Sequence, residues 1–148
     1  IGQLQTNKVR QLADLVAVYE TVDRVKLARE IAKRAPGARV LIQVDTAGQE
    51  GKGGWPIERI DELVEEVVGL DLRLDGLMTV GPTGAPPEDA RAGFRAVRAE
   101  VERLGLAICS MGMTADLEIA VQEGSTQVRV GTALFGERSV HTPRDQAG

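Results

Sequence analysis

The sequence has few of the residues that carry acid–base, nucleophilic or metal chemistry. Among its 148 residues, cysteine and histidine occur once each and aromatic residues make up 3%. The single Cys109 excludes an internal disulfide framework, fits a reducing compartment, and is expected to be a small core residue rather than a nucleophile. His141 lies in a polar stretch near the C-terminal end, where we expect it to be solvent-exposed rather than catalytic. No set of His, Cys, Asp or Glu has the spacing of a metal site.

Long apolar runs and basic clusters are also missing. The formal net charge of −4 and the absence of a Lys/Arg cluster argue against a nucleic-acid surface. No run approaches the ~20 apolar residues of a transmembrane helix, and no basic, apolar leader is found, so we expect a cytoplasmic protein without a membrane contact. With 43% hydrophobic residues, the chain is long enough for one domain with an aliphatic core. Protein partners are not indicated.

Short apolar strands alternate with amphipathic helices. β-Branched and aliphatic runs predict strands at 15–22, 39–45, 74–80, 106–109 and 127–130. Apolar spacing and capping signals predict helices from Lys8 to about Leu12 with Asn7 as N-cap, from an Asp23 N-cap to Pro36-Gly37, from Pro56 onward, from Glu88 to about Leu104, and from Ala115 to Glu123. This alternation is typical of parallel strands joined by helical crossovers.

Two architectures fit this order: an open doubly wound sheet or a (β/α)8 barrel. A barrel takes ~250 residues, so the chain supplies only about five or six of the βα units. Ile1-Gly2 reads as the end of a strand whose beginning is absent. We therefore expect an incomplete (β/α)8 barrel, with residues 1–138 as the C-terminal portion of one barrel and 139–148 as a polar tail.

Two small-residue turns follow the last two predicted strands. The first contains Ser110, Met111 and Gly112, and the second contains Gly131 and Thr132. In barrels, the loops after the last strands frequently bind phosphate, with backbone N–H groups as donors. Either turn alone is explained by tight chain reversal. Two matching turns at these positions favour a single phosphate pocket.

Arg129 lies within a predicted strand, where a permanent charge needs a partner. If its side chain points into the barrel mouth, it donates to a ligand, and because guanidinium keeps its protons it would leave a pyridine nitrogen unprotonated. The alternative is an ion pair on the outer face. The glycine-rich loop from Thr46 to Trp55, with Lys52, is either a mobile lid or a flexible connection.

Four segments together resemble the pyridoxal phosphate homeostasis protein family, a single-domain group related to the N-terminal barrel of alanine racemase. They are IGQLQTNK at 1–8, GLMT at 76–79, SMGMTAD at 110–116 and GSTQVRVGTALFG at 124–136. The resemblance covers nearly the whole chain. It implies a (β/α)8 barrel that holds pyridoxal 5′-phosphate (PLP) at its mouth.

The resemblance also implies roles for residues. The phosphate is expected at the Ser110–Met111–Gly112 turn and at Gly131 and Thr132, the ring nitrogen at Arg129, and Asn7 near the cofactor. The family's Schiff-base lysine is expected upstream of Ile1, and Lys8, Lys26, Lys33 and Lys52 do not match it. The implied function is intracellular PLP homeostasis, as a cofactor carrier or buffer without an established turnover. The alternatives are a PLP-dependent amino-acid racemase-like enzyme and a barrel for another phosphorylated metabolite.

Overall fold

The computed structural model describes residues 1–46, 48 and 53–136 of the chain. The strands are β1 Val18–Val22, β2 Ala38–Asp45, β3 Trp55–Pro56, β4 Leu72–Thr79 and β5 Ile108–Ser110. The α-helices are α1 Val9–Leu12, α2 Val25–Arg34, α3 Ile60–Val68, α4 Arg91–Arg103, α5 Leu117–Gln122 and α6 Thr132–Phe135. The 3-10 turns are η1 Thr6–Lys8, η2 Ile57–Arg59 and η3 Pro87–Ala90. No helix within these ranges is long and apolar enough to cross a membrane. Lys52, His141 and the predicted tail at 139–148 lie outside the described residues.

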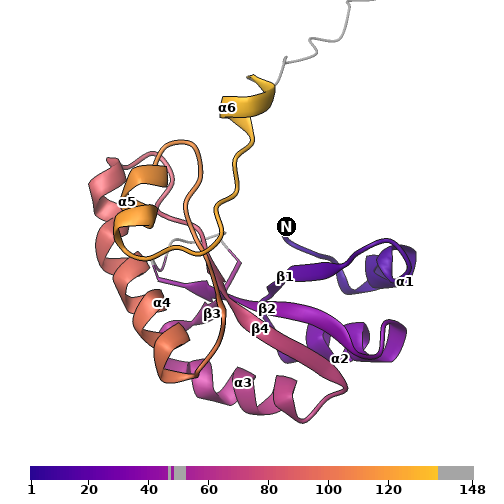
Figure 1. Ribbon diagram of the computed structural model, residues 1–148. Coiled ribbons are helices and arrows are strands. Elements are labelled where there is room, and N and C mark those ends of the chain that lie inside the picture. The colour runs from indigo at the N-terminus through magenta and orange to yellow at the C-terminus, as the bar shows by residue number, and fades with distance from the viewer. Residues whose placement is uncertain (47, 49–52, 137–148) are drawn as a thin grey trace, which may run out of the picture.

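The strands form one parallel sheet. Their order is β1-β2-β4-β5, and the short β3 pairs with the end of β2. Figure 1 shows α2, α3 and α4 along the outside of this sheet. Each of these helices connects one parallel strand to a later one, which is the repeating unit of a (β/α)8 barrel. An open doubly wound sheet would carry helices on both faces, so the arrangement matches the predicted incomplete barrel.

The core lies between the helices and the outer face of the sheet. The buried positions of α3 are Ile60, Leu63 and Val67, and those of α4 are Phe94, Val97 and Val101. Their spacing of three and four puts each set on one face of its helix. They pack into one cluster with alternate residues of β2, namely Val40, Ile42 and Val44. This aliphatic cluster is what the low aromatic content predicts.

The inner face of the sheet is partly polar. Gln43 of β2 pairs with Met78 of β4, and Met78 pairs with Ser110 of β5. Paired residues of parallel strands lie on the same face, so these side chains line the inner side. Glu20 of β1 accepts a hydrogen bond of 2.9 Å from Ser110, although β2 and β4 lie between their strands. The sheet is therefore curled like the wall of a barrel.

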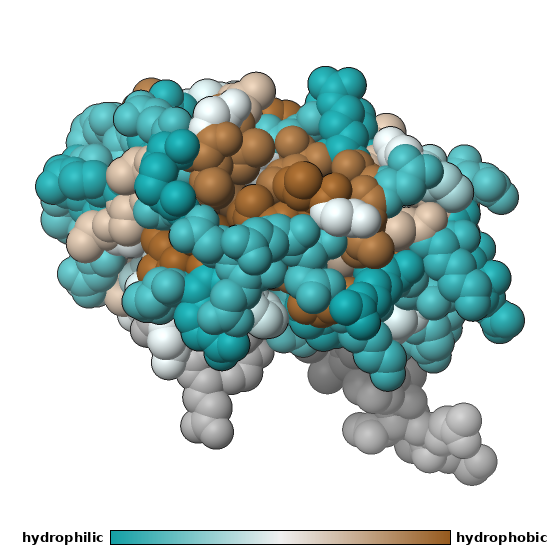
Figure 2. All heavy atoms as spheres, turned by 90° about the horizontal axis from the view of Figure 1, so that it is seen from below, coloured by the Kyte–Doolittle hydropathy of each residue, from teal (hydrophilic) through white to brown (hydrophobic). Residues whose placement is uncertain are grey.

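The surface is not uniformly polar. On the face seen from below in Figure 2, hydrophobic residues gather in the middle and hydrophilic residues surround them. The aliphatic layer of the fold therefore reaches the surface on this face. Large hydrophobic side chains are also exposed elsewhere in the described chain, including Leu134 and Phe135 of α6.

The structure corrects three predicted helix starts. Asn7 is not an N-cap but lies inside η1, because the amide of Lys8 already closes a turn onto the oxygen of Gln5 at 2.9 Å. Asp23 does not cap α2, since its carboxylate forms an ion pair with Arg24 instead. Pro56 has extended backbone angles and belongs to β3, so the helical turns begin only at η2.

The predicted strand at 127–130 is also wrong. Only Gln127 forms a bridge, to Ser110. The main-chain amide of Met111 donates to the main-chain oxygen of Gln127, but the amide of Arg129, two residues further along, donates to the oxygen of Gly112 at 3.0 Å. Gly112 has a φ of +95°, which turns the chain after β5 away from the direction of the strand. The ladder therefore ends after a single bridge.

Candidate functional site

Arg129 is fixed at the carboxyl ends of two strands. Its guanidinium donates to the main-chain oxygen of Ser110 at 2.9 Å, to the Ser110 hydroxyl at 2.9 Å and to the main-chain oxygen of Thr79 at 2.7 Å. Ser110 ends β5 and Thr79 ends β4. Among the described residues, no carboxylate lies within ion-pair distance of Arg129. The outer-face ion pair considered from the sequence is therefore not what this structure shows.

Arg129 is partly buried and lies close to negative charge. Burial lowers the pKa of Arg129 from its ordinary value, while the carboxylates of Glu20 and Asp116 raise it. A guanidinium remains protonated despite such shifts. Arg129 therefore offers permanent hydrogen-bond donors at the mouth of the curled sheet.

Ser110 connects Arg129 to a carboxylate. The hydroxyl of Ser110 is fully buried and donates to Oε2 of Glu20 at 2.9 Å. The other oxygen of Glu20 accepts a hydrogen bond of 2.6 Å from the side-chain Nε2 of Gln127. Glu20, Ser110, Gln127 and Arg129 thus form one hydrogen-bonded cluster, which we call the Glu20–Arg129 cluster.

The turn after β5 is shaped by Gly112. A Cβ placed there would lie 2.5 Å from the Cβ of Ala120 in α5, and the φ of +95° disfavours any other residue. Met111 is fully buried and its Sδ lies 3.7 Å from Sγ of Cys109. The amide of Met113 donates to the carboxylate of Asp116 at 2.7 Å. Met111 therefore supports the turn from the core, while Gly112 allows α5 to approach it.

The second predicted turn lies apart from the first. Gly131 and Thr132 are exposed, and no atom lies within 4 Å of a Cβ placed on Gly131. Figure 1 shows that α6, which begins at Thr132, lies away from the sheet. The main-chain amide of Arg129, two residues before Gly131, donates to the oxygen of Gly112 at 3.0 Å. In this structure the two turns do not form one enclosed pocket.

Asn7 lies on a different part of the surface. It is exposed, and it lines a shallow depression with Glu30 and Arg34 of α2. Within the described residues, no hydrogen bond joins Asn7 to Ser110 or Arg129. The structure therefore brings together Ser110, Met111, Gly112 and Arg129, and leaves Asn7, Gly131 and Thr132 outside this group.

Sequence reasoning missed Glu20. The available signal was a lone carboxylate inside a β-branched run, and the structure shows that its neighbours Tyr19 and Thr21 are buried. Such a charge needs a partner, but its partners are 90 and 107 residues away. Only the curvature of the sheet reveals them.

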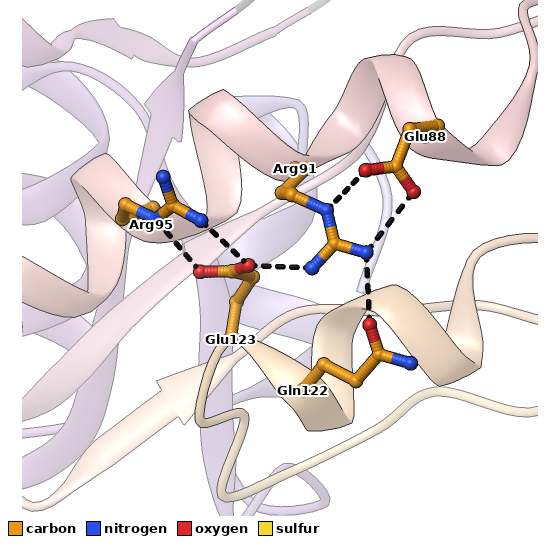
Figure 3. Close-up of polar contacts among 5 residues, drawn as sticks. All are labelled: Glu88, Arg91, Arg95, Gln122 and Glu123. Carbon is orange, nitrogen blue, oxygen red and sulfur yellow. Dashed lines mark hydrogen bonds and ion pairs between the residues drawn. The ribbon is translucent and has the colours of Figure 1, made fainter.

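An ion-pair network holds α5 against α4 on the outer surface (Figure 3). Arg91 of α4 contacts Glu88 and donates to Glu123 at 2.7 Å and to Gln122 at 2.8 Å. Arg95 donates to the second oxygen of Glu123 at 3.0 Å. Hydrogen bonds from Arg95 and Arg91 lower the pKa of Glu123. Because α5 directly follows the 110–113 turn, this network supports the turn from outside.

Cysteine and metal chemistry find no support in the geometry. Burial raises the pKa of Cys109 to about 11, so its thiol is protonated at neutral pH and poorly nucleophilic. Within 1–46, 48 and 53–136, no group of three or more His, Cys, Asp or Glu residues could hold a metal ion. What the site offers is a set of hydrogen-bond donors.

Comparison with known proteins identifies the family. Residues 1–139 match the family described as alanine racemase, N-terminal domain. The chain is 45% identical over 149 residues to the pyridoxal phosphate homeostasis protein of Aquifex aeolicus, covering 93% of this chain and 65% of that protein. It is 35% identical to the protein of the same name from Schizosaccharomyces pombe, covering 98% of this chain and 67% of that one.

Solved structures agree with this family and with the fold. PipY of Synechococcus elongatus with PLP bound matches with a TM-score of 0.80 and 29% identity, over 92% of this chain and 68% of that chain. Alanine racemase from Clostridium difficile matches with a TM-score of 0.73 at 17% identity, over 95% of this chain and 40% of that one, and supports the fold alone.

The predicted incomplete (β/α)8 barrel is confirmed by these neighbours. The chain spans 65% of the length of the Aquifex aeolicus relative and 67% of the Schizosaccharomyces pombe relative. The chain therefore belongs to the alanine racemase N-terminal domain family and, within it, to the group of pyridoxal phosphate homeostasis proteins.

Proposed function

We propose that the protein binds PLP at the carboxyl end of the sheet and acts in intracellular PLP homeostasis, as a carrier or buffer of the cofactor. The observation that carries this proposal is the fixed guanidinium of Arg129 at the ends of β4 and β5. Support also comes from relatives named pyridoxal phosphate homeostasis proteins and from the PLP-bound structure of PipY. A cytoplasmic location stays a prediction from the sequence.

The donors of Arg129 fit the pyridine ring. A guanidinium has five N–H donors, and three hydrogen bonds to Ser110 and Thr79 are formed. The remaining donors can meet an acceptor such as an unprotonated ring nitrogen. Because Arg129 has no proton acceptor to offer, it would favour that unprotonated form.

The phosphate is assigned to main-chain donors. Gly112, Gly131 and Thr132 are the small or hydroxyl residues at the two turns, and the first amides of a helix such as α6 lack partners within the helix. Met111 supports the Gly112 turn from the core. Asn7 enters the proposal only through the family resemblance, because it lies beside α2 in this structure.

Binding by this chain is proposed to be non-covalent. PLP carries an aldehyde that reacts with amines, so covalent binding needs a lysine in the site. Lys8 lies in η1, and Lys26 and Lys33 lie in α2, in the outer helical layer. None of these three is among the residues that contact Arg129 or Ser110.

A racemase-like activity remains the second hypothesis, but few features of the site support it. Such an enzyme needs a free acid or base near the cofactor. In the Glu20–Arg129 cluster, both oxygens of Glu20 already accept hydrogen bonds. Incubation with L- and D-amino acids in deuterated water separates the two functions, because only the enzyme exchanges the α-hydrogen rapidly.

Titration of the purified chain with PLP, followed by fluorescence, tests the proposal. We expect saturable binding that pyridoxine 5′-phosphate, which lacks the aldehyde, matches closely. Borohydride treatment followed by peptide mass analysis should not find a saturable adduct on Lys8, Lys26 or Lys33. Absence of saturable PLP binding would overturn the proposal, and displacement by sugar phosphates would favour another phosphorylated metabolite.

A further inference from the structure

Two arginines lie side by side at the amino ends of neighbouring strands. Arg39 is the second residue of β2 and Arg73 is the second residue of β4, and the two are paired in the parallel ladder. Val40, which follows Arg39, belongs to the core between the sheet and the helices. Because side chains alternate between the two faces of a strand, Arg39 and Arg73 lie on the inner face. Two positive charges placed next to each other repel, so this pair needs a carboxylate nearby.

Asp75 supplies this carboxylate from a β-bulge in β4. The ladder pairs residues 40 and 41 of β2 with Leu74 and Gly76, which leaves Asp75 as an extra residue between them. A bulge of this kind redirects a side chain. Strand β5 approaches closely at the same point, since a Cβ on Gly76 would lie 2.0 Å from the main-chain oxygen of Ile108. The backbone around Asp75 is therefore confined between β2 and β5, and its carboxylate has a fixed place.

Both arginines share the carboxylate of Asp75. Nε of Arg73 donates to Oδ1 at 2.7 Å, and Nε of Arg39 donates to Oδ2. The side chain of Asp75 is 7% exposed, whereas those of Arg39 and Arg73 are 45% and 69% exposed. Burial raises the pKa of Asp75, but the hydrogen bonds from Arg39 and Arg73 outweigh this effect and hold the pKa below its usual value. Asp75 is therefore ionised at neutral pH.

One positive charge in this group is not compensated. Among the described residues, Asp75 is the only carboxylate within ion-pair distance of Arg39 or Arg73. A guanidinium has five N–H donors, and in the part of the chain that the structure describes each arginine uses only its Nε–H. The terminal NH₂ groups of both side chains therefore stay open, and they carry an excess of positive charge in a chain whose formal net charge is −4.

A purely structural bridge does not need the second arginine. The pair of Arg39 and Asp75 already joins β2 to β4, and a second, largely exposed ion pair adds little stability. Two adjacent guanidinium forks instead match an oxyanion, because each fork can donate to two oxygens at once. A carboxylate has two oxygens and fills one fork, whereas a phosphate group has enough oxygens for both. The donor set therefore favours phosphate.

We infer that Arg39 and Arg73 bind the phosphate group of a small phosphorylated molecule at the amino ends of β2 and β4, and that Asp75 positions both guanidiniums. Arg129 contacts Thr79 at the other end of β4. At about 3.3 Å per residue, that end lies roughly 20 Å from Arg73. The anion site is therefore separate from the proposed PLP site and does not depend on it. Neither the sequence motifs nor the relatives' names assign a ligand to these residues.

Titration of the ¹⁵N-labelled chain with inorganic phosphate at constant ionic strength tests the inference. We expect the Nε signals of Arg39 and Arg73 to shift saturably, and acetate to bind there several-fold more weakly. These signals report the site locally, so phosphate bound elsewhere on the chain does not affect the measurement. Shifts that do not saturate would mean only a diffuse attraction of counterions, and equal affinity for acetate would contradict the assignment to phosphate.

Substitutions separate the anion site from a structural bridge. Arg73→Gln should weaken phosphate binding at the Arg39 signal about tenfold, the size expected for one charge-assisted hydrogen bond. Arg73→Lys keeps the charge but loses the fork, so we expect a loss of several-fold there. Arg29→Gln is the matched control, because Arg29 is also exposed and ion-paired, with Glu66, and it should leave phosphate binding unchanged.

Three results would overturn the inference: unchanged phosphate affinity in Arg73→Gln, full affinity in Arg73→Lys, or an equal loss in Arg29→Gln. Urea unfolding of the same variants completes the test. A lower stability of Arg73→Gln with unchanged phosphate affinity would mark the arginines and Asp75 as a structural bridge only. If Arg73→Gln does not fold, Arg39→Gln replaces it, with binding followed at the Arg73 signal and the same tenfold loss expected.

Discussion

Arg129 donates a hydrogen bond of 2.7 Å to the main-chain oxygen of Thr79, which lies 50 residues earlier in the sequence. This bond, together with the two to Ser110, sets the guanidinium between the ends of β4 and β5. The acceptors are two backbone carbonyls and one buried hydroxyl, so the position of Arg129 depends on the sheet itself. The position of the guanidinium is therefore preorganised without a ligand.

Replacing Arg129 with glutamine should weaken PLP binding at least about tenfold, because the variant loses the positive charge and several donors to buried acceptors. Fluorescence titration with PLP measures the change. Arg10→Gln, at an exposed position of α1, is the matched control for net charge. Equal PLP affinity of the two variants would show that Arg129 does not contact the cofactor.

Gly112→Ala should destabilise the fold by about 2–4 kcal/mol, because the new Cβ meets Ala120 and the backbone has a positive φ. Urea unfolding followed by circular dichroism measures the free energy of unfolding. Gly131→Ala is the control, since space around that residue is open and its φ is −118°. We expect a change within about 0.5 kcal/mol there. Similar losses in both variants would contradict the account of the turn.

Glu123→Gln should reduce stability at neutral pH and have little effect in acid. Hydrogen bonds from Arg95 and Arg91 lower the folded-state pKa of Glu123. A lowered pKa means that the stabilisation is present above the unfolded carboxyl pKa of about 4.3 and is lost as pH falls through the folded value. Urea unfolding of both proteins between neutral and acid pH gives the difference. A stability gap that persists unchanged in acid would contradict this role of the network.

The sequence predicts much of this fold because its signals are local. The continuous apolar run at 39–45 identifies β2, which is buried on both faces, and the spacing of Ile60, Leu63 and Val67 identifies α3, which is buried on one face. The failure at 127–130 has a long-range cause: the partner strand turns away at Gly112. β-Branched content alone cannot report where a neighbouring strand ends.

The site was predictable only in part, for the same physical reason. The carboxyl-end rule places the turn of Ser110 and Gly112 at one edge of the sheet, and the structure brings Arg129 to this turn. Glu20 reaches the site because the sheet is curved, and no pattern along the sequence predicts this curvature. The open position of Gly131 and Thr132 likewise depends on how 128–136 leaves the sheet.

The most direct test of the PLP site is a titration of the ¹⁵N-labelled chain with PLP, followed by amide and arginine side-chain NMR signals. We predict saturable shifts at residues 110–113 and 129–132 and at the Arg129 side chain, with pyridoxal, which lacks the phosphate, shifting mainly Arg129. Shifts confined to other surfaces, such as the depression beside Asn7, or no saturable shifts at all, would contradict the account.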